Sequence, residues 1–265
     1  MITKPLRISK IDWGNPLTRN LISYIACNEM AGVPSDLVPG SKGDGIGGFT
    51  WGTNGLYTNA GGSNILFNNT IINIGTGNFT LMSLCSVNSS ATISAVPILL
   101  FQGSAYVYLG LNRGGSTPTP MSGKFMLGTY NGTTNQVADT VGTSFCDGKL
   151  HTYAGIKNNN VGSLYFDGLA ATVGTNTIGS HNITGGNPPQ SRLAAPAAGL
   201  QHTISYAAAW NRALTPAEIA QLHANPWQLL AQSSASRLLR LLSAPFSGVS
   251  RGRSLIGISR GRMLG

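Results

Sequence analysis

Residues 206–230 read YAAAWNRALTPAEIAQLHANPWQLL and contain the clearest local signals in the sequence. Thr215 is a typical helix N-cap, Pro216 suits the first helical position because it has no N–H to leave unpaired, and Glu218 completes a capping box. Leu214 and Ile219 have the spacing of a hydrophobic staple around this start. These signals predict that a helix begins at Pro216.

The end of this helix is also marked in the sequence. Asn225 is suited to a left-handed position after the last helical residue, and Pro226 cannot continue a helix. We therefore predict one short helix over 216–224, with Trp227 packing behind it.

A strand over 202–210 is predicted to precede the helix. Because successive side chains of a strand point to opposite faces, one face of this strand carries small side chains and the other carries bulky ones. The bulky face is expected to carry Ile204, Tyr206, Ala208 and Trp210. Such a strand suits a sandwich of two sheets, with the helix closing one end.

The strand, the helix and the Asn-Pro-Trp that follows it resemble the C-terminal part of laminin-G-like, concanavalin A-like jelly-roll domains, in particular those of tailed-bacteriophage virion proteins. A second pair of motifs, GKLHTYA at 148–154 and LYFDG at 164–168, resembles the same family, although Leu150 replaces its usual tryptophan. Asp167-Gly168 by itself predicts a type I′ hairpin turn. The resemblance extends over about 21–230 and implies a jelly-roll fold.

Composition favours an all-β fold as well. The 265 residues include 35 glycines and 13 prolines, which suits many short strands joined by turns. We predict a concanavalin A-like (laminin-G-like) jelly-roll sandwich over 21–231 with one short C-terminal helix, flanked by extended arms over 1–20 and 232–265. A long connection is expected over 174–199. The other predicted strands are 21–26, 65–67, 71–74, 79–87, 97–101, 106–111, 125–130, 137–141, 151–157, 163–166 and 169–173.

The sequence offers little for catalysis. Jelly-roll glycosidases need two carboxylates about 5 to 9 Å apart, and the only glutamates are Glu29 and Glu218, of which Glu218 is expected to cap the helix. The histidines lack metal-ligand spacing, and we expect structural roles for all of them: His151, His181, His202 and His223. We predict that the protein is not an enzyme.

Cofactors are not expected either. Asp36, Asp44 and Asp167 are weak Ca²⁺ candidates on the analogy of some laminin-G-like domains, and we favour turn-forming or solvated roles for them. The odd number of cysteines (Cys27, Cys85, Cys146) in apolar segments predicts buried thiols.

Aromatic residues in the glycine-rich region 43–62 are possible sugar platforms. Trp51 and Tyr57 are the carbohydrate-binding candidates there, although packing in a core or an interface is the commoner role for such side chains.

The C-terminal region is basic and repetitive. GVSRGRSL at 248–255 recurs as GISRGRML at 257–264. We predict an arm that becomes ordered on a partner protein, with apolar side chains filling pockets and arginines meeting carboxylates. Nucleic-acid binding ranks second and solvated disorder third. The residues expected to bind the partner are Arg237, Arg240, Arg251, Arg253, Leu255, Arg260, Arg262 and Leu264.

Two functions fit these patterns. The first, which we favour, is a non-enzymatic virion structural protein, capsid-decorating or tail-associated, that binds other virion proteins and itself. The charge-free stretch between Asp44 and Arg113 suits packing in such an assembly. The alternative is an adhesion module for host-surface glycans. With no signal-like apolar region near Met1 and no run of about 18 apolar residues, we expect synthesis in the host cytoplasm, location in the virion and no membrane attachment.

Overall fold

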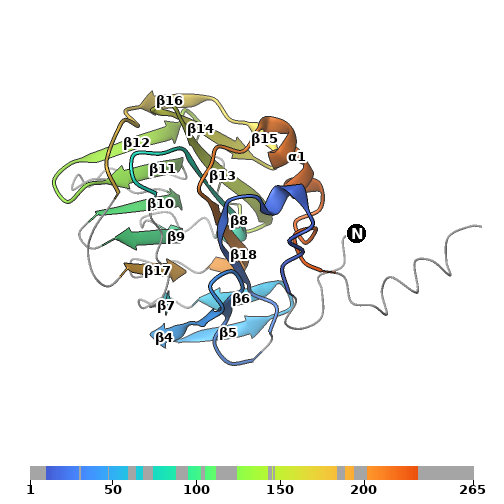
Figure 1. Ribbon diagram of the computed structural model, residues 1–265. Helices are drawn as coiled ribbons and strands as arrows, with labels where there is room; N and C mark the ends of the chain where they lie inside the picture. The colour runs from blue at the N-terminus through green and yellow to red at the C-terminus, as the bar shows by residue number, and fades with distance from the viewer. Residues whose placement is uncertain are drawn as a thin grey trace, which may run out of the picture. The chain divides into compact units, whose positions relative to one another are not determined.

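The computed structural model describes residues 10–29, 31–46, 48–58, 64–67, 74–87, 95–102, 105–111, 124–142, 145, 147–183, 189–193 and 202–231. Within the compact unit Met1–Ala231, the described strands form two antiparallel sheets that face each other (Figure 1). This is the all-β sandwich that the sequence predicts.

The ten-stranded sheet is the one that the helix covers. Its order is β15 (Leu169–Ala170), β14 (Val161–Phe166), β13 (Leu150–Asn158), β8 (Phe79–Val87), β18 (His202–Trp210), β1 (Leu21–Ala26), β2 (Ser35–Asp36) and β3 (Ser41–Lys42). A hairpin of β5 (Phe49–Gly52) and β6 (Gly55–Thr58) is joined to it through pairing of β6 with β18.

The eight-stranded sheet forms the second layer. Its order is β16 (Val173–Asn176), β12 (Asn135–Thr140), β11 (Phe125–Tyr130), β10 (Ala105–Leu111), β9 (Ala95–Gln102), β17 (Pro189–Leu193), β7 (Asn64–Phe67) and β4 (Asp44–Ile46). The described helical elements are the 3₁₀ turn η1 (Pro16–Thr18) and the helix α1 (Pro216–Ala224).

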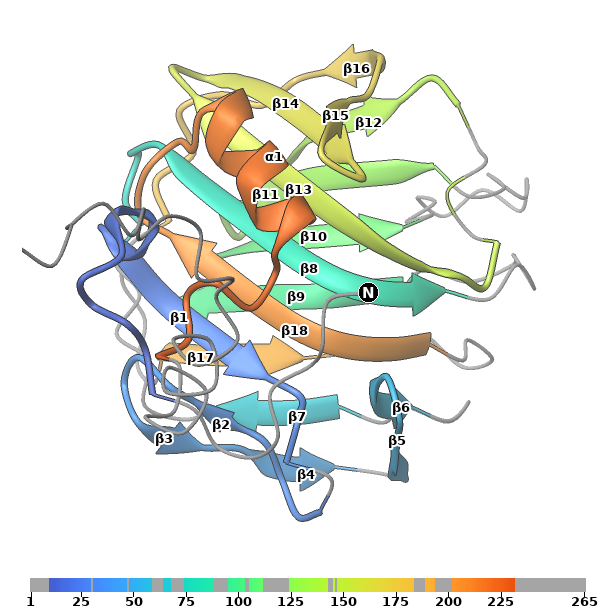
Figure 2. The ribbon, with the colours of Figure 1, turned by 90° about the vertical axis from the view of Figure 1, so that its right-hand side faces the viewer.

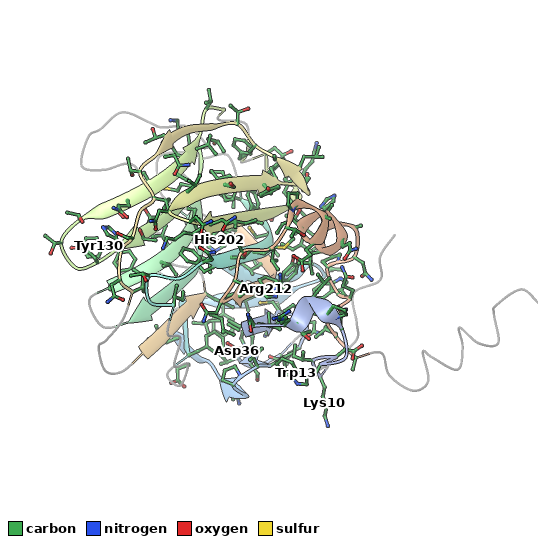
Figure 3. The ribbon with its side chains drawn as sticks, turned by 45° about the horizontal axis from the view of Figure 1, so that its top comes forward. Lys10, Trp13, Asp36, Tyr130, His202 and Arg212 are labelled. Atoms are coloured by element: carbon green, nitrogen blue, oxygen red, sulfur yellow. The ribbon has the colours of Figure 1, made fainter. Side chains whose placement is uncertain are left out.

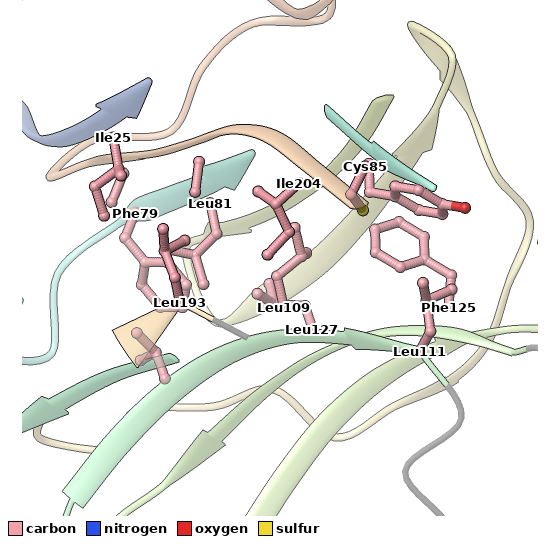
Figure 4. Packing of buried hydrophobic residues seen from close by; sticks show 14 of the residues in the cluster. Ile25, Phe79, Leu81, Cys85, Leu109, Leu111, Phe125, Leu127, Leu193 and Ile204 are labelled. Atoms are coloured by element: carbon pink, nitrogen blue, oxygen red, sulfur yellow. The ribbon is translucent and has the colours of Figure 1, made fainter. Parts of the chain in front are cut away.

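The first core lies between the two sheets. Inward-facing side chains of both sheets form one buried cluster (Figure 4), which includes Ile25, Phe79, Leu81, Cys85, Leu109, Leu111, Phe125, Leu127, Leu193 and Ile204. Full burial of such a side chain contributes about 1.5 to 3 kcal/mol, so this cluster is a main source of stability.

A second core lies on the outer face of the ten-stranded sheet. Here α1 lies across β13 and β8 (Figure 2). The residues of this helix-side cluster include Leu17, Tyr24, Met82, Ile156, Tyr206, Trp210, Ile219, Leu222, Trp227 and Leu230. Trp227 thus packs behind the helix as predicted.

Strand β18 corrects one sequence prediction. Its pairing with β8 shifts register between Ile204 and Tyr206, so Ile204 faces the other sheet while Tyr206 and Trp210 face the helix. The prediction that these three share one face was wrong, because a β-bulge inserts one residue and reverses the alternation beyond it.

The helix itself forms as predicted. It spans Pro216–Ala224, Thr215 accepts a hydrogen bond from the N–H of Glu218, and the Glu218 carboxylate accepts one from the N–H of Thr215. The left-handed position expected for Asn225 is wrong, since its φ is −142°. The helix ends instead with the Asn225 N–H bonded to the Gln221 carbonyl.

Removal of the Thr215 cap is expected to destabilise the protein. Thr215→Ala leaves the first-turn N–H groups with one acceptor fewer, and we expect the free energy of unfolding to fall by about 1 kcal/mol. Urea denaturation followed by circular dichroism measures it. Thr172→Ala, at an exposed threonine outside the helix, is the matched control. Equal stability of the two variants would contradict a role for the cap.

Most predicted strands are present. Strands 21–26, 79–87, 125–130 and 202–210 have the predicted ends. The type I′ turn is confirmed by positive φ values at Asp167 (49°) and Gly168 (79°). Strands β2 to β6, β16 and β17 were not predicted, because these short segments occupy stretches that we read almost entirely as loops. The predicted strand 169–173 is divided between β15 and the first residue of β16. Residues 71–73 and Cys146 lie outside the described residues.

The two ends of the described chain lie side by side. The Asp12 N–H donates to the Leu229 carbonyl (2.8 Å), and the Ala231 N–H donates to the Lys10 carbonyl (2.7 Å). Ile11 is buried in the helix-side cluster, although it falls within the range 1–20 that we expected to be an arm. Residues 1–9 and the whole range 232–265, with all of its predicted partner-binding residues, lie outside the described residues.

Candidate binding site

The predicted sugar candidates Trp51 and Tyr57 do not form one platform. Trp51 packs against the core between the sheets, and its Nε1–H donates to the Gly32 carbonyl (2.8 Å). Tyr57 pairs in register with Thr50, whereas Trp51 pairs with Leu56. The two rings therefore leave opposite faces of the β5–β6 hairpin.

The Ca²⁺ candidates are likewise dispersed. Asp36 is fully buried and accepts hydrogen bonds from the Ser23 hydroxyl (2.5 Å) and from the N–H groups of Tyr24 and Val38, and burial raises the pKa of its carboxyl. Asp44 is exposed on the edge strand β4. Among the described residues, no group of three or more His, Cys, Asp and Glu side chains is arranged to hold a metal ion.

One rim of the sandwich gathers histidines and aspartates. His151 Nδ1 lies 2.6 Å from Asp167 Oδ2, and its Nε2 lies 2.9 Å from Asp147 Oδ1. His223 on α1 reaches the Thr152 hydroxyl at 2.8 Å. A hydrogen bond from the Lys149 N–H lowers the pKa of Asp147. This cluster ties two turns and α1 together, which is a structural role for both histidines.

The opposite end of the sandwich contains a second polar group. His181 lies between the hydroxyls of Thr129 (3.1 Å) and Thr134 (3.0 Å), and burial lowers its pKa, with Lys157 adding to the effect. The Lys157 ammonium, whose pKa burial also lowers, donates to the Thr76 carbonyl at 2.6 Å. These contacts fix the loops at this end, next to the tyrosines described below.

The outer face of the eight-stranded sheet carries a cluster of tyrosines. Tyr106 and Tyr130 are cross-strand partners on β10 and β11, with ring centroids 4.9 Å apart at an interplanar angle of 31°. Tyr108, next along the same face, lies 6.0 Å from Tyr106 between ring centroids. Tyr106 and Val137 pack against the buried pair Tyr108 and Met126. We call Tyr106, Tyr108, Tyr130, Asn135 and Val137 the tyrosine patch.

Gly128 explains how Tyr108 fits into this patch. The two residues are register partners, and a Cβ added at Gly128 would overlap the Tyr108 ring. The ring therefore lies over the backbone of β11, fully buried, with its hydroxyl 3.5 Å from Asn135 Oδ1. Tyr106 and Tyr130 remain half-buried beside it, so each residue is partly accessible.

Sequence reasoning missed the tyrosine patch. Tyr106 and Tyr108 alternate with the core residues Val107 and Leu109, which is a detectable sign that they share the other face of a strand. Their proximity to Tyr130 and Asn135 depends on strand register, which the sequence alone does not reveal.

Comparison with known proteins agrees with this architecture. A family model described as the concanavalin A-like lectin/glucanases superfamily matches residues 59–220. This chain belongs to that superfamily. No curated protein matches the chain in sequence.

Solved structures similar to this concanavalin A-like chain include botulinum neurotoxin binding domains. One is the binding domain of botulinum neurotoxin DC in complex with rat synaptotagmin II, at 11% identity and TM-score 0.60 over 78% of this chain and 52% of that chain. Another is the binding domain of botulinum neurotoxin serotype D, at 11% identity and TM-score 0.60 over 79% of this chain and 53% of that chain. The chain spans about half the length of these structures, and the likeness is one of fold.

The superfamily's description includes glucanases, so the two glutamates are of interest. Glu29 accepts a hydrogen bond from the Ser35 N–H, and burial raises its pKa. The Glu218 carboxylate accepts hydrogen bonds from both terminal guanidinium nitrogens of Arg212, Nη1 (2.9 Å) and Nη2 (2.8 Å). Burial alone would raise the pKa of Glu218, but the bonds from Arg212 and Thr215 lower it. A carboxylate committed to a cap and a bidentate pair is a poor general acid.

None of the helices in the described ranges is long and apolar enough to cross a membrane.

Proposed function

We propose that the protein is a non-catalytic, lectin-type recognition domain carried by a larger assembly, such as the virion of a tailed bacteriophage. The observation that supports this is the difference between the two outer faces of the sandwich. The outer face of the ten-stranded sheet is covered by α1, η1 and the paired chain ends. The other outer face carries Tyr106 and Tyr130, which are the half-buried rings of the tyrosine patch. In Figure 3, Tyr130 lies on the side away from Lys10 and Trp13. This difference supports a division of roles, in which the chain's own segments pack on one face and the other face is the one proposed to bind a ligand.

Charge supports attachment through the terminal segments. Lys10 and Ala231, the neighbouring ends of the described chain, lead into 1–9 and 232–265. These two segments contain eight of the 17 lysines and arginines of the protein and no acidic residue. A partner with an acidic surface is the expected complement.

The assembly proposal is tested by particle composition. Mass spectrometry of purified virions is expected to detect the full-length protein, and a variant ending at Ala231 is expected to fold and yet be absent from the particles. Incorporation of that variant at wild-type occupancy would contradict attachment through 232–265. Loss of the full-length protein only after nuclease treatment would favour nucleic acid as the partner.

The recognition proposal is tested separately with the purified protein. A glycan array is expected to show binding that is unaffected by a chelator, and incubation with β-glucans is expected to release no reducing ends. An array without signal from folded protein would contradict recognition of glycans. Reducing-end release that Glu29→Gln abolishes would contradict the non-catalytic assignment.

A further inference from the structure

We infer that the tyrosine patch on β10, β11 and β12 is a binding site for a neutral glycan, whose sugar rings stack on Tyr106 and Tyr130 and whose hydroxyls bond to the amide of Asn135 and to the adjoining turn. This inference rests on the recognition function proposed above and gives it a location and a ligand class.

The surface of the tyrosine patch has the shape and chemistry that suit a sugar. Tyr106 and Tyr130 lie side by side with ring centroids 4.9 Å apart, and Tyr106 packs against the buried Tyr108 and Met126, as Val137 does. Aromatic rings offer an apolar face with a negative quadrupole and a polar tip, which complements the C–H groups and hydroxyls of a sugar. Asn135, the register partner of Tyr130 on β12, is exposed and adds an amide donor and acceptor at the edge.

The turn beside the tyrosine patch is held by several hydrogen bonds. The turn after Tyr130 is held by the Asn131 Oδ1 atom, which accepts from the N–H groups of Thr133 (3.0 Å) and Thr134 (2.8 Å). The Tyr130 hydroxyl donates to the Gly132 carbonyl at 2.8 Å. His181 bonds to Thr134 from the other side, as described above. A site held in this way loses little conformational entropy when a ligand binds.

The strands that carry the tyrosine patch contain little charge. Within β10, β11, β12 and the turn between β11 and β12, the charged side chain is Asp139, and it is paired with Lys124 at 3.3 Å. Asp139 is four residues from Asn135, about 13 Å along the strand. Recognition of a sulfated, carboxylated or phosphorylated ligand normally depends on arginine or lysine at the site, which makes a neutral sugar the ligand that fits.

A second copy of the chain is the competing occupant of an apolar sheet face. Among the described residues, the exposed ones that follow Tyr130 in the chain are Asn131, Gly132, Thr133, Thr134 and Asn135, which are polar and uncharged. Self-association normally relies on a larger hydrophobic core, so this composition favours a hydrated ligand.

The test uses the full chain and three soluble polysaccharides: a neutral β-glucan, a neutral α-mannan and a sulfated polymer. Affinity is measured at about 0.05 M and 0.5 M NaCl, because binding to a neutral sugar is insensitive to screening. Tyr106→Ala and Tyr130→Ala are each expected to weaken binding of a neutral polymer about tenfold or more, as for buried aromatic anchors. Tyr165→Ala, on β14 of the other sheet, is the matched control and is expected to bind as wild type. Thermal melting verifies that each variant is folded.

Each alternative outcome has a distinct meaning. If the wild type binds a neutral glycan and the Tyr106 and Tyr130 variants bind equally well, or Trp51→Ala and Tyr57→Ala alone reduce binding, the site is wrong while the recognition function stands. Binding of the sulfated polymer alone, lost at high salt, overturns the ligand class. A dimer that Tyr106→Ala dissociates, without glycan binding, overturns the inference in favour of self-association. Absence of binding to any glycan by the folded wild type overturns the recognition function itself.

Discussion

Replacing Trp210 with alanine is expected to lower the free energy of unfolding by about 3 to 5 kcal/mol. The ring is fully buried in the helix-side cluster, so its removal leaves a cavity in addition to the lost transfer free energy. Its Nε1–H also donates to the Leu17 carbonyl at 2.8 Å, which connects the end of β18 to η1. The variant leaves that buried carbonyl without its donor, which adds to the cost.

Equilibrium denaturation in guanidinium chloride measures this loss as a lower midpoint at unchanged slope. Trp13→Ala is the control, because Trp13 is 60% exposed and its replacement is expected to change stability by less than about 0.5 kcal/mol. Trp210→Phe keeps part of the packing but removes the hydrogen bond, and its stability is expected to lie between those of the wild type and the alanine variant. An unchanged midpoint for Trp210→Ala would show that the ring does not support the helix layer.

Features coded by neighbouring residues were predictable from the sequence. The helix start depends on Thr215, Pro216 and Glu218, which act within one turn, and the hairpin at Asp167-Gly168 depends on two adjacent residues. The long strands β8 and β18 carry enough apolar residues to be located. In each case the deciding interactions lie within a few residues along the chain, where propensity and spacing carry the information.

Features that depend on partners distant in sequence were not predictable. The bulge after Ile204 exists only in the pairing of β18 with β8, and the short strands β4 and β17 are ordered by neighbours in the sheet. The tyrosine patch also requires the register between β10 and β11, which brings Tyr106 to Tyr130. Strand register also explains why Trp51 and Tyr57 do not form one site. The register of the β5–β6 hairpin places the two side chains on opposite faces.

Acidification is expected to destabilise the protein through His202. This side chain is fully buried on β18, and burial lowers its pKa from 6.5 to about 4. Between these two values the unfolded chain binds a proton that the native state does not bind. The free energy of unfolding therefore falls as the pH drops below about 6.5, by up to about 1.4 kcal/mol per pH unit, and the total loss approaches about 3 kcal/mol near pH 4. Above pH 6.5 both states are neutral at this residue, so it contributes no pH dependence there.

Other groups modify the profile without removing this signal. The pKa of His181 is also lowered, so it adds a loss in the same direction, whereas the raised pKa values of Glu29 and Asp36 favour the native state as those carboxyls become protonated. The contribution of His202 is isolated by comparing the wild type with His202→Gln in urea denaturation from about pH 7.5 to 4.5. The variant is expected to lose less stability on acidification even if it is less stable at neutral pH, since an absolute offset does not change the slope. Parallel profiles for the two proteins would show that His202 takes up its proton equally in the native and unfolded states, contrary to its burial.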